Sequence, residues 1–555
     1  MKGAGAALIL PRLTLALLVL PVAAGLAGTL LPAVSGFQAL IGWPGLPRAA
    51  ALSVISGGAS TLIALALTGL IVAMLHDRPG FALLRRLLSP LLAVPHAAAA
   101  LGLAFLIAPS GWIARALSPW ATGWQVPPDL LLINDPGGIA LTLGLVAKEV
   151  PFLLLMALAA LPACDAPRRL AVTSALGYGR LAGFALAVWP ALYARLRLPV
   201  MAVLAYGMTT VEMAAILGPT LPPTLSVQVA EWMMAPTLDR METGAAGAAL
   251  QLALVLAVMG LWHLAARLGA EALRRGAEAG RRGRMADGPA RALAALAGYG
   301  LPAVLGLALA GLALWSVAGR WDYPAALPEA LTLKHWARAA PALGATLATT
   351  LAIAATATTA ALVLVIGCLE AERRAGLAPG RAAEAALYLP LMVPQIAFLP
   401  GLQMAALALG LDGHWPAVAA AHLIFVLPYA FLSLAPAFRG WDARHGLAAA
   451  TLGAGPARIF WRIRLPMLLA PVATAAALGL AVSVGQYLPT LLIGAGRVGT
   501  LTTEAVALAS GGNRRLIGAW GLAQLVLPAA GFALALALPR LVFRHRRAML
   551  AGGAA

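Results

Sequence analysis

The segment LAAATLGAGPARIFWRIRLP occupies residues 447–466 and lies between two long apolar runs. Small residues surround Gly453, and glycine can take backbone angles that other residues avoid. We therefore predict a short helix, a tight turn and a second short helix. Pro466 should open the next apolar helix, because a proline costs little in a first turn. Three arginines should keep the segment out of the lipid: Arg458, Arg462 and Arg464.

This spacing resembles the EAA loop of ABC importer permeases, written E-A-A, three residues, G, nine residues and I-x-L-P. Six residues fall in that register: Ala448, Ala449, Gly453, Ile463, Leu465 and Pro466. Leu447 stands where the family has glutamate. In that family the loop is a cytoplasmic coupling helix, which docks into a cleft of a separate ATPase subunit. The resemblance implies that this segment, including Phe460, contacts an ATPase. The alternative is an ordinary cytoplasmic loop of a multi-pass membrane protein.

The composition indicates a membrane protein, since 61% of the residues are apolar and 11% are charged. A soluble chain could not bury so much apolar surface, and here it comes in long blocks. The net charge of +19 could suggest nucleic acid, but the basic residues form short clusters between apolar runs. Positive-inside topology explains that distribution, so we expect no nucleic-acid partner. Cys164 and Cys368 lack metal-ligand spacing and are expected to be reduced, structural residues.

Because about 20 apolar residues cross the hydrocarbon core as a helix, we predict six spans in each half. Those of the first half are 12–34, 52–75, 88–109, 138–161, 192–217 and 244–267. Those of the second half are 293–317, 342–368, 384–410, 415–437, 467–494 and 515–543. A cleaved signal peptide is the alternative for the first run, which exceeds the usual apolar length of about 7–15 residues.

The arginines predict the orientation. Clusters follow alternate spans: Arg78, Arg85, Arg86, Arg168, Arg169, Arg180, Arg373, Arg374, Arg381, Arg439, Arg444, Arg544, Arg546 and Arg547. This side should be the cytoplasm, and both termini should lie there. Three arginines on the opposite side are exceptions: Arg497, Arg514 and Arg515. Residues 271–291 are polar and basic, and we predict a cytoplasmic linker between a first unit (1–270) and a second unit (292–555).

The two halves repeat one another at an offset of about 276 residues. Pairs at this offset include Gly177 with Gly453, Phe184 with Phe460, and Pro190 with Pro466. Prolines and glycines at one offset are unlike the chance matches of an alanine-rich chain. We predict a tandem duplication with parallel topology. The first copy of the loop has diverged, because Ala187 and Trp189 replace the Ile and Leu of the motif.

Polar residues inside the spans are candidates for a translocation pathway, because an ionisable group in hydrocarbon costs several kcal/mol. We name five such candidates: Lys148, Glu149, Glu212, Ser483 and Gln486. A charge pair within the protein is the alternative for Lys148 and Glu149, and a structural hydrogen bond is the alternative for Glu212. His96 and His422 are expected to be packing residues.

No nucleotide-binding loop, metal-ligand pair or nucleophile–base set occurs in the sequence, so we expect no enzymatic activity, metal or cofactor. Over nearly its whole length the chain resembles fused double permeases of ABC importers, most of all the thiamine and ferric-iron group. An uncharacterised branch named as thiamine permeases is the nearest match within that group.

The resemblance implies an all-α multi-pass protein of about 12 spans in two tandem parallel six-helix repeats, the type I ABC importer permease fold. It also implies a bacterial inner-membrane location, two copies of an ATP-binding cassette ATPase, a periplasmic or extracellular substrate-binding protein, and thiamine or ferric iron as substrate. The alternative is a secondary transporter that uses intramembrane carboxylates such as Glu149 and Glu212.

Overall fold

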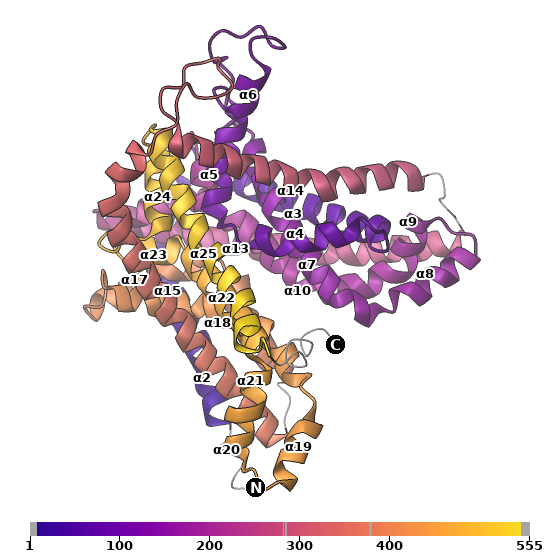
Figure 1. Ribbon diagram of the computed structural model, residues 1–555. Coiled ribbons are helices and arrows are strands. Elements are labelled where there is room, and N and C mark those ends of the chain that lie inside the picture. Colours follow the sequence, from indigo (N-terminus) through magenta and orange to yellow (C-terminus); the bar gives the residue numbers. More distant parts are fainter. Residues whose placement is uncertain (1–7, 281, 283–285, 377–379, 546–555) are drawn as a thin grey trace.

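The computed structural model describes residues 8–280, 282, 286–376 and 380–545, and Figure 1 shows them as a helical molecule. In these residues, 10 helices are long and apolar enough to cross a membrane, or up to 12 if each of two bent pairs counts as one span. Large apolar side chains on these helices face outward, including Leu31, which is 77% exposed. Such a surface requires a lipid environment. The prediction of an all-α multi-pass membrane protein is confirmed.

The elements of the first half are α2 (Ile9–Ile41), α3 (Leu46–Leu75), α4 (Phe81–Ala93), α5 (His96–Ile107), α6 (Trp112–Leu117), α7 (Ile139–Ala160), η1 (Leu161–Cys164), α8 (Ala166–Ala175), α9 (Arg180–Gly183), η2 (Phe184–Val188), α10 (Trp189–Thr209), α11 (Glu212–Leu217), α12 (Leu225–Met233) and α13 (Leu238–Glu278). Those of the second half are α14 (Asp287–Val317), α15 (Lys334–Ala375), α16 (Arg381–Met392), α17 (Gln395–Ala408), α18 (Trp415–Arg439), α19 (Ala443–Thr451), α20 (Pro456–Ile459), η4 (Phe460–Arg464), α21 (Leu465–Met467), α22 (Leu469–Gly485), α23 (Leu488–Ile493), α24 (Leu501–Ala509) and α25 (Arg514–Val542).

The predicted duplication is visible element by element. The π-helical segments η2 and η4, the short helices α11 and α23, and the helices α12 and α24 each begin 276 residues apart. Side-chain contacts repeat as well. Ser53 Oγ accepts the Leu225 N–H at the start of α12, and Thr350 Oγ1 accepts the Leu501 N–H at the start of α24, both at 3.0 Å. The two halves therefore repeat the same elements in the same order.

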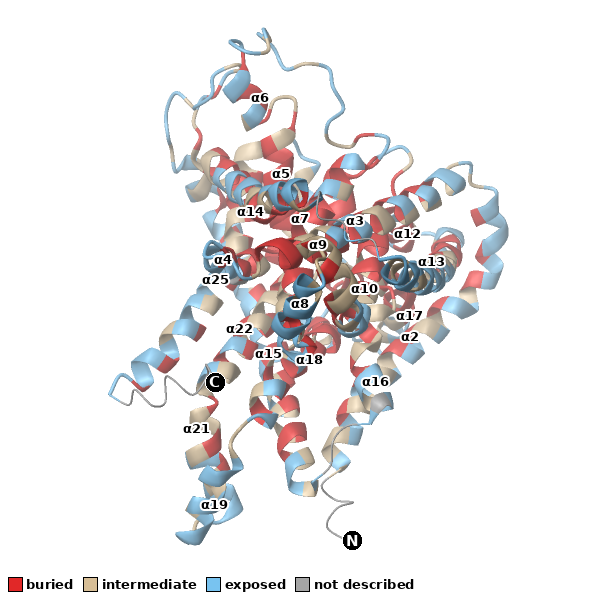
Figure 2. Cartoon of the chain, turned by 90° about the vertical axis from the view of Figure 1, so that its right-hand side faces the viewer, coloured by how far each residue is buried: buried red, intermediate tan, exposed pale blue. Residues whose placement is uncertain are grey.

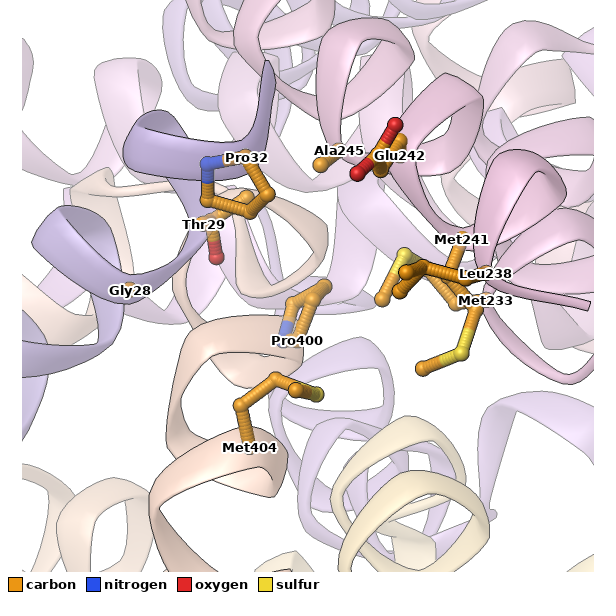
Figure 3. A pocket seen from close by; sticks show the side chains of 10 residues that line it. All are labelled: Gly28, Thr29, Pro32, Met233, Leu238, Met241, Glu242, Ala245, Pro400 and Met404. Atoms are coloured by element: carbon orange, nitrogen blue, oxygen red, sulfur yellow. The ribbon is translucent and has the colours of Figure 1, made fainter. Parts of the chain in front are cut away.

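The first helix of each half packs against the other half. Helix α2 contacts α17, and α14 contacts α5. Glycines permit both approaches: Gly25 and Gly401 bring α2 and α17 backbone to backbone, and a Cβ on Gly102 would stand 3.0 Å from the Ala308 carbonyl oxygen. A small cavity of about 40 Å³ remains beside the α2–α17 contact, where Pro32, Pro400 and neighbouring methionines line it (Figure 3). Because the first helix of each half packs against the other half, the two halves form one body.

Four predicted spans are broken rather than continuous. Span 88–109 divides into α4 and α5 before His96, and span 384–410 divides into α16 and α17 with a bend of 88°. In both cases a proline that lacks an N–H precedes the second helix, so the first helix cannot continue. Span 192–217 breaks between α10 and α11, and span 467–494 breaks between α22 and α23.

One expectation about the second loop is wrong in detail. Pro466 lies in the three-residue helix α21, and the long helix α22 begins only at Leu469, after a bend of 70°. The predicted linker 271–291 is mostly helical, because α13 continues to Glu278 and α14 begins at Asp287. Within that linker Arg281, Gly283 and Arg284 lie outside the described residues, as do both chain ends, residues 1–7 and 546–555.

Candidate coupling loops and translocation pathway

The second loop consists of α19, a turn and α20, and hydrogen bonds explain its shape. Asp442 caps α19, since its carboxylate accepts the Arg444 N–H at 2.9 Å. The hydrogen bond from the Arg444 side chain also lowers the pKa of Asp442. At the other end, Gly453 has φ +83°, its N–H donates to the Ala450 carbonyl, and the next N–H donates to the Ala449 carbonyl. This pair of bonds is a Schellman turn, and it favours glycine.

The first loop has the same turn although its motif has diverged. Gly177 has φ +84°, its N–H donates to the Ser174 carbonyl, and the Tyr178 N–H donates to the Thr173 carbonyl. The π-helical segment follows each turn at the same distance, beginning at Phe184 or Phe460. The predicted helix–turn–helix geometry is therefore present in both loops.

The two loops share an anchoring pattern. Phe184 and Phe460 are buried, whereas Leu176 and Leu452, which stand one residue before the turn glycines, are 59% and 87% exposed. Helix α19 has no buried residue, and Figure 2 shows it as largely exposed. Ala448 lies on this exposed surface. Figure 1 places the loops, at α8–α9 and α19–α20, at the ends of two diverging arms. Each loop thus has an inner anchor and a free apolar tip.

The remaining motif residues differ in exposure between the two loops. Ala449, Ile463, Leu465 and Pro466 are partly covered by neighbouring elements, and Pro190 of the first loop is exposed. Arg464, which was expected with Arg458 and Arg462 to keep the segment out of the lipid, is buried inside the protein. Its side chain is 2% exposed and pairs with Glu370 of α15 at 2.5 Å, so it ties the second loop to a long helix.

The first loop is held by the segment that joins the halves. The Asp287 carboxylate accepts the backbone N–H groups of Arg180 and Leu181 at 2.7 and 2.9 Å, at the start of α9. The Arg180 side chain donates to the Ala73 carbonyl and pairs with Asp77. Nothing local in the sequence indicates this contact, because Asp287 and Arg180 are 107 residues apart.

In the first half, polar side chains gather where α10 breaks before α11. Glu212 begins α11, so it lies at this break and not within a continuous span as predicted. The Tyr206 hydroxyl donates to Glu212 Oε1 at 2.8 Å, and the Thr210 hydroxyl donates to the Tyr206 oxygen at 3.3 Å. The His96 ring lies against Tyr206 with centroids 4.7 Å apart. His96, expected to be a packing residue, is therefore part of this cluster.

Glu149 and Lys148 are neighbours on α7 but have separate surroundings. Ser60 Oγ lies 3.4 Å from Glu149 Oε1, and Glu149 Oε2 is buried without a partner among the described residues. Lys148 Nζ instead donates to the carbonyls of Leu91 and Val94 at 3.0 and 2.6 Å. These carbonyls end α4, where a proline removes a helical donor. Lys148 is thus bound structurally and does not pair with Glu149.

The corresponding break in the second half is neutral. Gln486 stands between α22 and α23, and Gln395 Nε2 donates to Gln486 Oε1 at 3.4 Å. Ser483 is buried and lies 2.8 Å from His422 Nδ1, while His422 Nε2 lies 2.9 Å from Thr490 Oγ1. Ser483 and His422 therefore hold helices together, which agrees with the packing role expected for His422. Gln486 and Gln395 are the partly exposed polar residues at this break.

The break of the first half lies against the second half. Helix α11, which begins at the break of the first half, contacts α24 of the second half. His96 and Gln395 each follow a proline that breaks a span, and they contact Tyr206 and Gln486, respectively. The sequence reading missed Tyr206 and Gln395, although a proline directly before Gln395, as before His96, could have indicated a helix break at that position.

Comparison with known proteins gives consistent matches. The family described as "Binding-protein-dependent transport system inner membrane component" matches residues 363–544, which include the second loop. The "Inner membrane ABC transporter permease protein YnjC" of Escherichia coli (strain K12) is 32% identical over 500 residues, which are 90% of this chain and 89% of that protein. The "Molybdenum transport system permease protein ModB" of Mycobacterium tuberculosis is 29% identical over 216 residues, 37% of this chain and 78% of ModB. The protein of the same name from Mycobacterium bovis matches equally.

Proposed function

The chain belongs to the inner membrane permeases of binding-protein-dependent ABC transport systems, and from this premise we propose how it works. The two halves form the translocation pathway of an importer in the bacterial inner membrane. Two copies of a separate ATPase bind the loops at α8–α9 and α19–α20, and a substrate-binding protein delivers the substrate on the opposite side. Each ATPase interaction shifts the balance between two arrangements of the halves. The chain itself is a transport subunit, and ATP hydrolysis belongs to the partner.

The observation that carries this proposal is the repeated loop. Both loops keep a Schellman turn at a positive-φ glycine, a buried phenylalanine and an exposed leucine, all at an offset of 276 residues. An exposed apolar tip on a rigid, repeated element supports docking to a symmetric pair of partners. A secondary transporter would have no need of it.

Purification of the chain from its native membrane tests this proposal against the secondary transporter. We expect an ATP-binding cassette ATPase to co-purify, and uptake in reconstituted vesicles to require ATP. Uptake that runs on an ion gradient without an ATPase would establish the secondary transporter instead.

The pathway supports a cationic substrate of the thiamine or ferric-iron class. Glu212 and Glu149 lie on its first half, and neither forms an ion pair with a Lys or Arg in the described part of the chain. The second half contributes neutral Gln395 and Gln486. The relatives named for molybdenum transport point to an oxyanion, so uptake of thiamine, ferric iron and molybdate should be compared directly. ATP-dependent uptake of molybdate alone would refute the cationic assignment.

Substitution of Glu212 tests the pathway assignment. Glu212→Gln keeps the hydrogen bond with Tyr206 and removes the charge, worth about 1.5–3 kcal/mol when a cation binds it directly. We expect the half-saturating substrate concentration to rise roughly 10- to 100-fold, with unchanged protein abundance and ATPase assembly. Glu231→Gln, an exposed carboxylate of the same half, is the matched control. Normal kinetics in Glu212→Gln would give Glu212 a structural role.

Reporter fusions test the proposed orientation. Fusions at Gly276, at the end of α13, and at Gly380, before α16, should report the cytoplasm. A fusion at Gly123, in the segment after α6, should report the outside. The reason is the arginine asymmetry of the connecting segments. A cytoplasmic signal from Gly123 would contradict this arrangement.

A further inference from the structure

A basic hollow lies at the end of the molecule opposite the two loops. It is formed by residues 511–515, where α25 begins, together with Trp315 at the end of α14 and Trp321 after it, and its volume is about 520 Å³. Helix α6 lies beside α5 (Figure 1). The guanidinium of its Arg115 packs over the rings of Trp315 and Trp321. Under the proposed orientation this is the outer side, where positive charge is normally scarce.

Three guanidinium groups of this region are held in place without a carboxylate. Arg115 donates to the carbonyls of Ser110, Asp322 and Ala325, Arg514 donates to Ser110, and Arg515 donates to the carbonyls of Ala318 and Gly319. None of the three has an ion pair with an Asp or Glu in the residues that the structure covers. Carbonyl partners fix the geometry of these cations without forming an ion pair with them.

Aromatic rings pack against these cations. The Arg115 guanidinium lies 5.0 Å from the centroid of Trp321, and Arg514 lies 5.2 Å from that of Trp315. Trp315 is 5% exposed, and its indole N–H is buried without a partner in the described chain. Ring faces orient the guanidinium groups but do not neutralise them. The hollow is therefore a rigid, preformed set of positive charges.

The surroundings fit a protein partner better than a free ion. The segment between α14 and α15 exposes Leu327, Leu331 and Leu333, each between 63% and 69% exposed. Lys334 and Arg338 add further positive charge at the start of α15. Apolar side chains around a charged centre are typical of a protein interface, in which complementary charge guides the encounter.

We propose that this basic hollow receives an acidic lobe of the substrate-binding protein. Carboxylates of the lobe pair with Arg515 and Arg514, and the leucines after α14 cover the edge of the contact. The proposal rests on the proposed function for the existence of such a partner. It adds the place of docking, the sign of the partner's charge and a dependence of docking on ionic strength.

Asn513→Asp is the most direct test of this docking surface. Asn513 caps α25 by accepting the N–H groups of Arg515 and Leu516, and aspartate makes the same cap. The variant therefore keeps the fold and adds one negative charge at the exposed edge of the hollow. We expect the separately purified binding protein of the same system to bind the permease–ATPase complex in nanodiscs about 10-fold more weakly. The loss should shrink as NaCl is raised.

Arg48→Gln is the matched control, because Arg48 is exposed at the start of α3 on the same side and its loss changes the charge by the same amount. The binding protein should bind the Arg48→Gln permease with wild-type affinity. Arg515→Gln should weaken this binding as Asn513→Asp does. Unchanged affinity in Asn513→Asp would overturn the docking surface. The docking surface would also be overturned if sulfate bound in the hollow and did not compete with the binding protein. If no ATPase co-purifies, the proposed function fails; if it does and Asn513→Asp binds normally, only the docking surface fails.

Discussion

Gly453→Val is expected to uncouple ATP hydrolysis from uptake or to weaken association with the ATPase. Gly453 has φ +83°, and a Cβ there would meet no atom within 4 Å, so the whole effect comes from the backbone. Holding a β-branched residue in this conformation costs about 1–3 kcal/mol, equivalent to roughly 5- to 150-fold in the population of the docking shape. Co-purification with the ATPase and uptake measurements on the same preparation give the result.

Two variants show whether backbone shape is the cause. Gly453→Asn should behave almost as wild type, because asparagine tolerates the left-handed region. Gly177→Val should have a milder effect, since the first loop has lost most of the motif and is held by Asp287. Normal ATPase binding and uptake in Gly453→Val would mean that the second loop is not the coupling element.

Glu370→Gln should be the most destabilising single change near the second loop. Glu370 accepts hydrogen bonds from Arg464, Arg373 and Arg374 and is 6% exposed. Its loss leaves Arg464 buried with no carboxylate, and breaking a buried pair in this way costs about 3–5 kcal/mol. The midpoint of thermal unfolding of the purified chain should fall, and the loop should lose its tie to α15.

Arg464→Met should cost less than Glu370→Gln, because Glu370 would keep two other arginines. Arg373→Gln is the control, since that side chain is 43% exposed and exposed pairs contribute about 0–1 kcal/mol. Equal unfolding midpoints for Glu370→Gln and Arg373→Gln would show that the buried pair does not stabilise the loop.

Features of the fold that depend on neighbouring residues in the sequence could be predicted from the sequence. Long apolar runs predicted the spans, and Gly177 and Gly453 predicted the turns, because a positive φ strongly favours glycine. The duplication followed from prolines and glycines at one offset. Even the diverged first loop keeps its turn, since the backbone bonds around Gly177 do not depend on the lost side chains.

The candidate pathway was less predictable, because it depends on contacts between distant segments. Glu212 and Gln486 were found from polarity alone, but their partners Tyr206 and Gln395 come from other parts of the folded chain. Lys148 was expected in the pathway and instead binds carbonyls that a proline leaves free. Nor could the sequence show that Arg464 would be buried against Glu370, 94 residues earlier.

Site-specific cross-linking at the loop tips tests the central claim most directly. Leu452→Cys and Leu176→Cys place a thiol at the exposed residue before each turn glycine. Neither of the native cysteines, Cys164 and Cys368, is exposed. With a bifunctional reagent in native membranes, each variant should form a cross-link to the ATPase subunit that depends on the introduced cysteine. If neither forms a cross-link while the ATPase is present and assembled, the loops do not couple this permease to ATP hydrolysis.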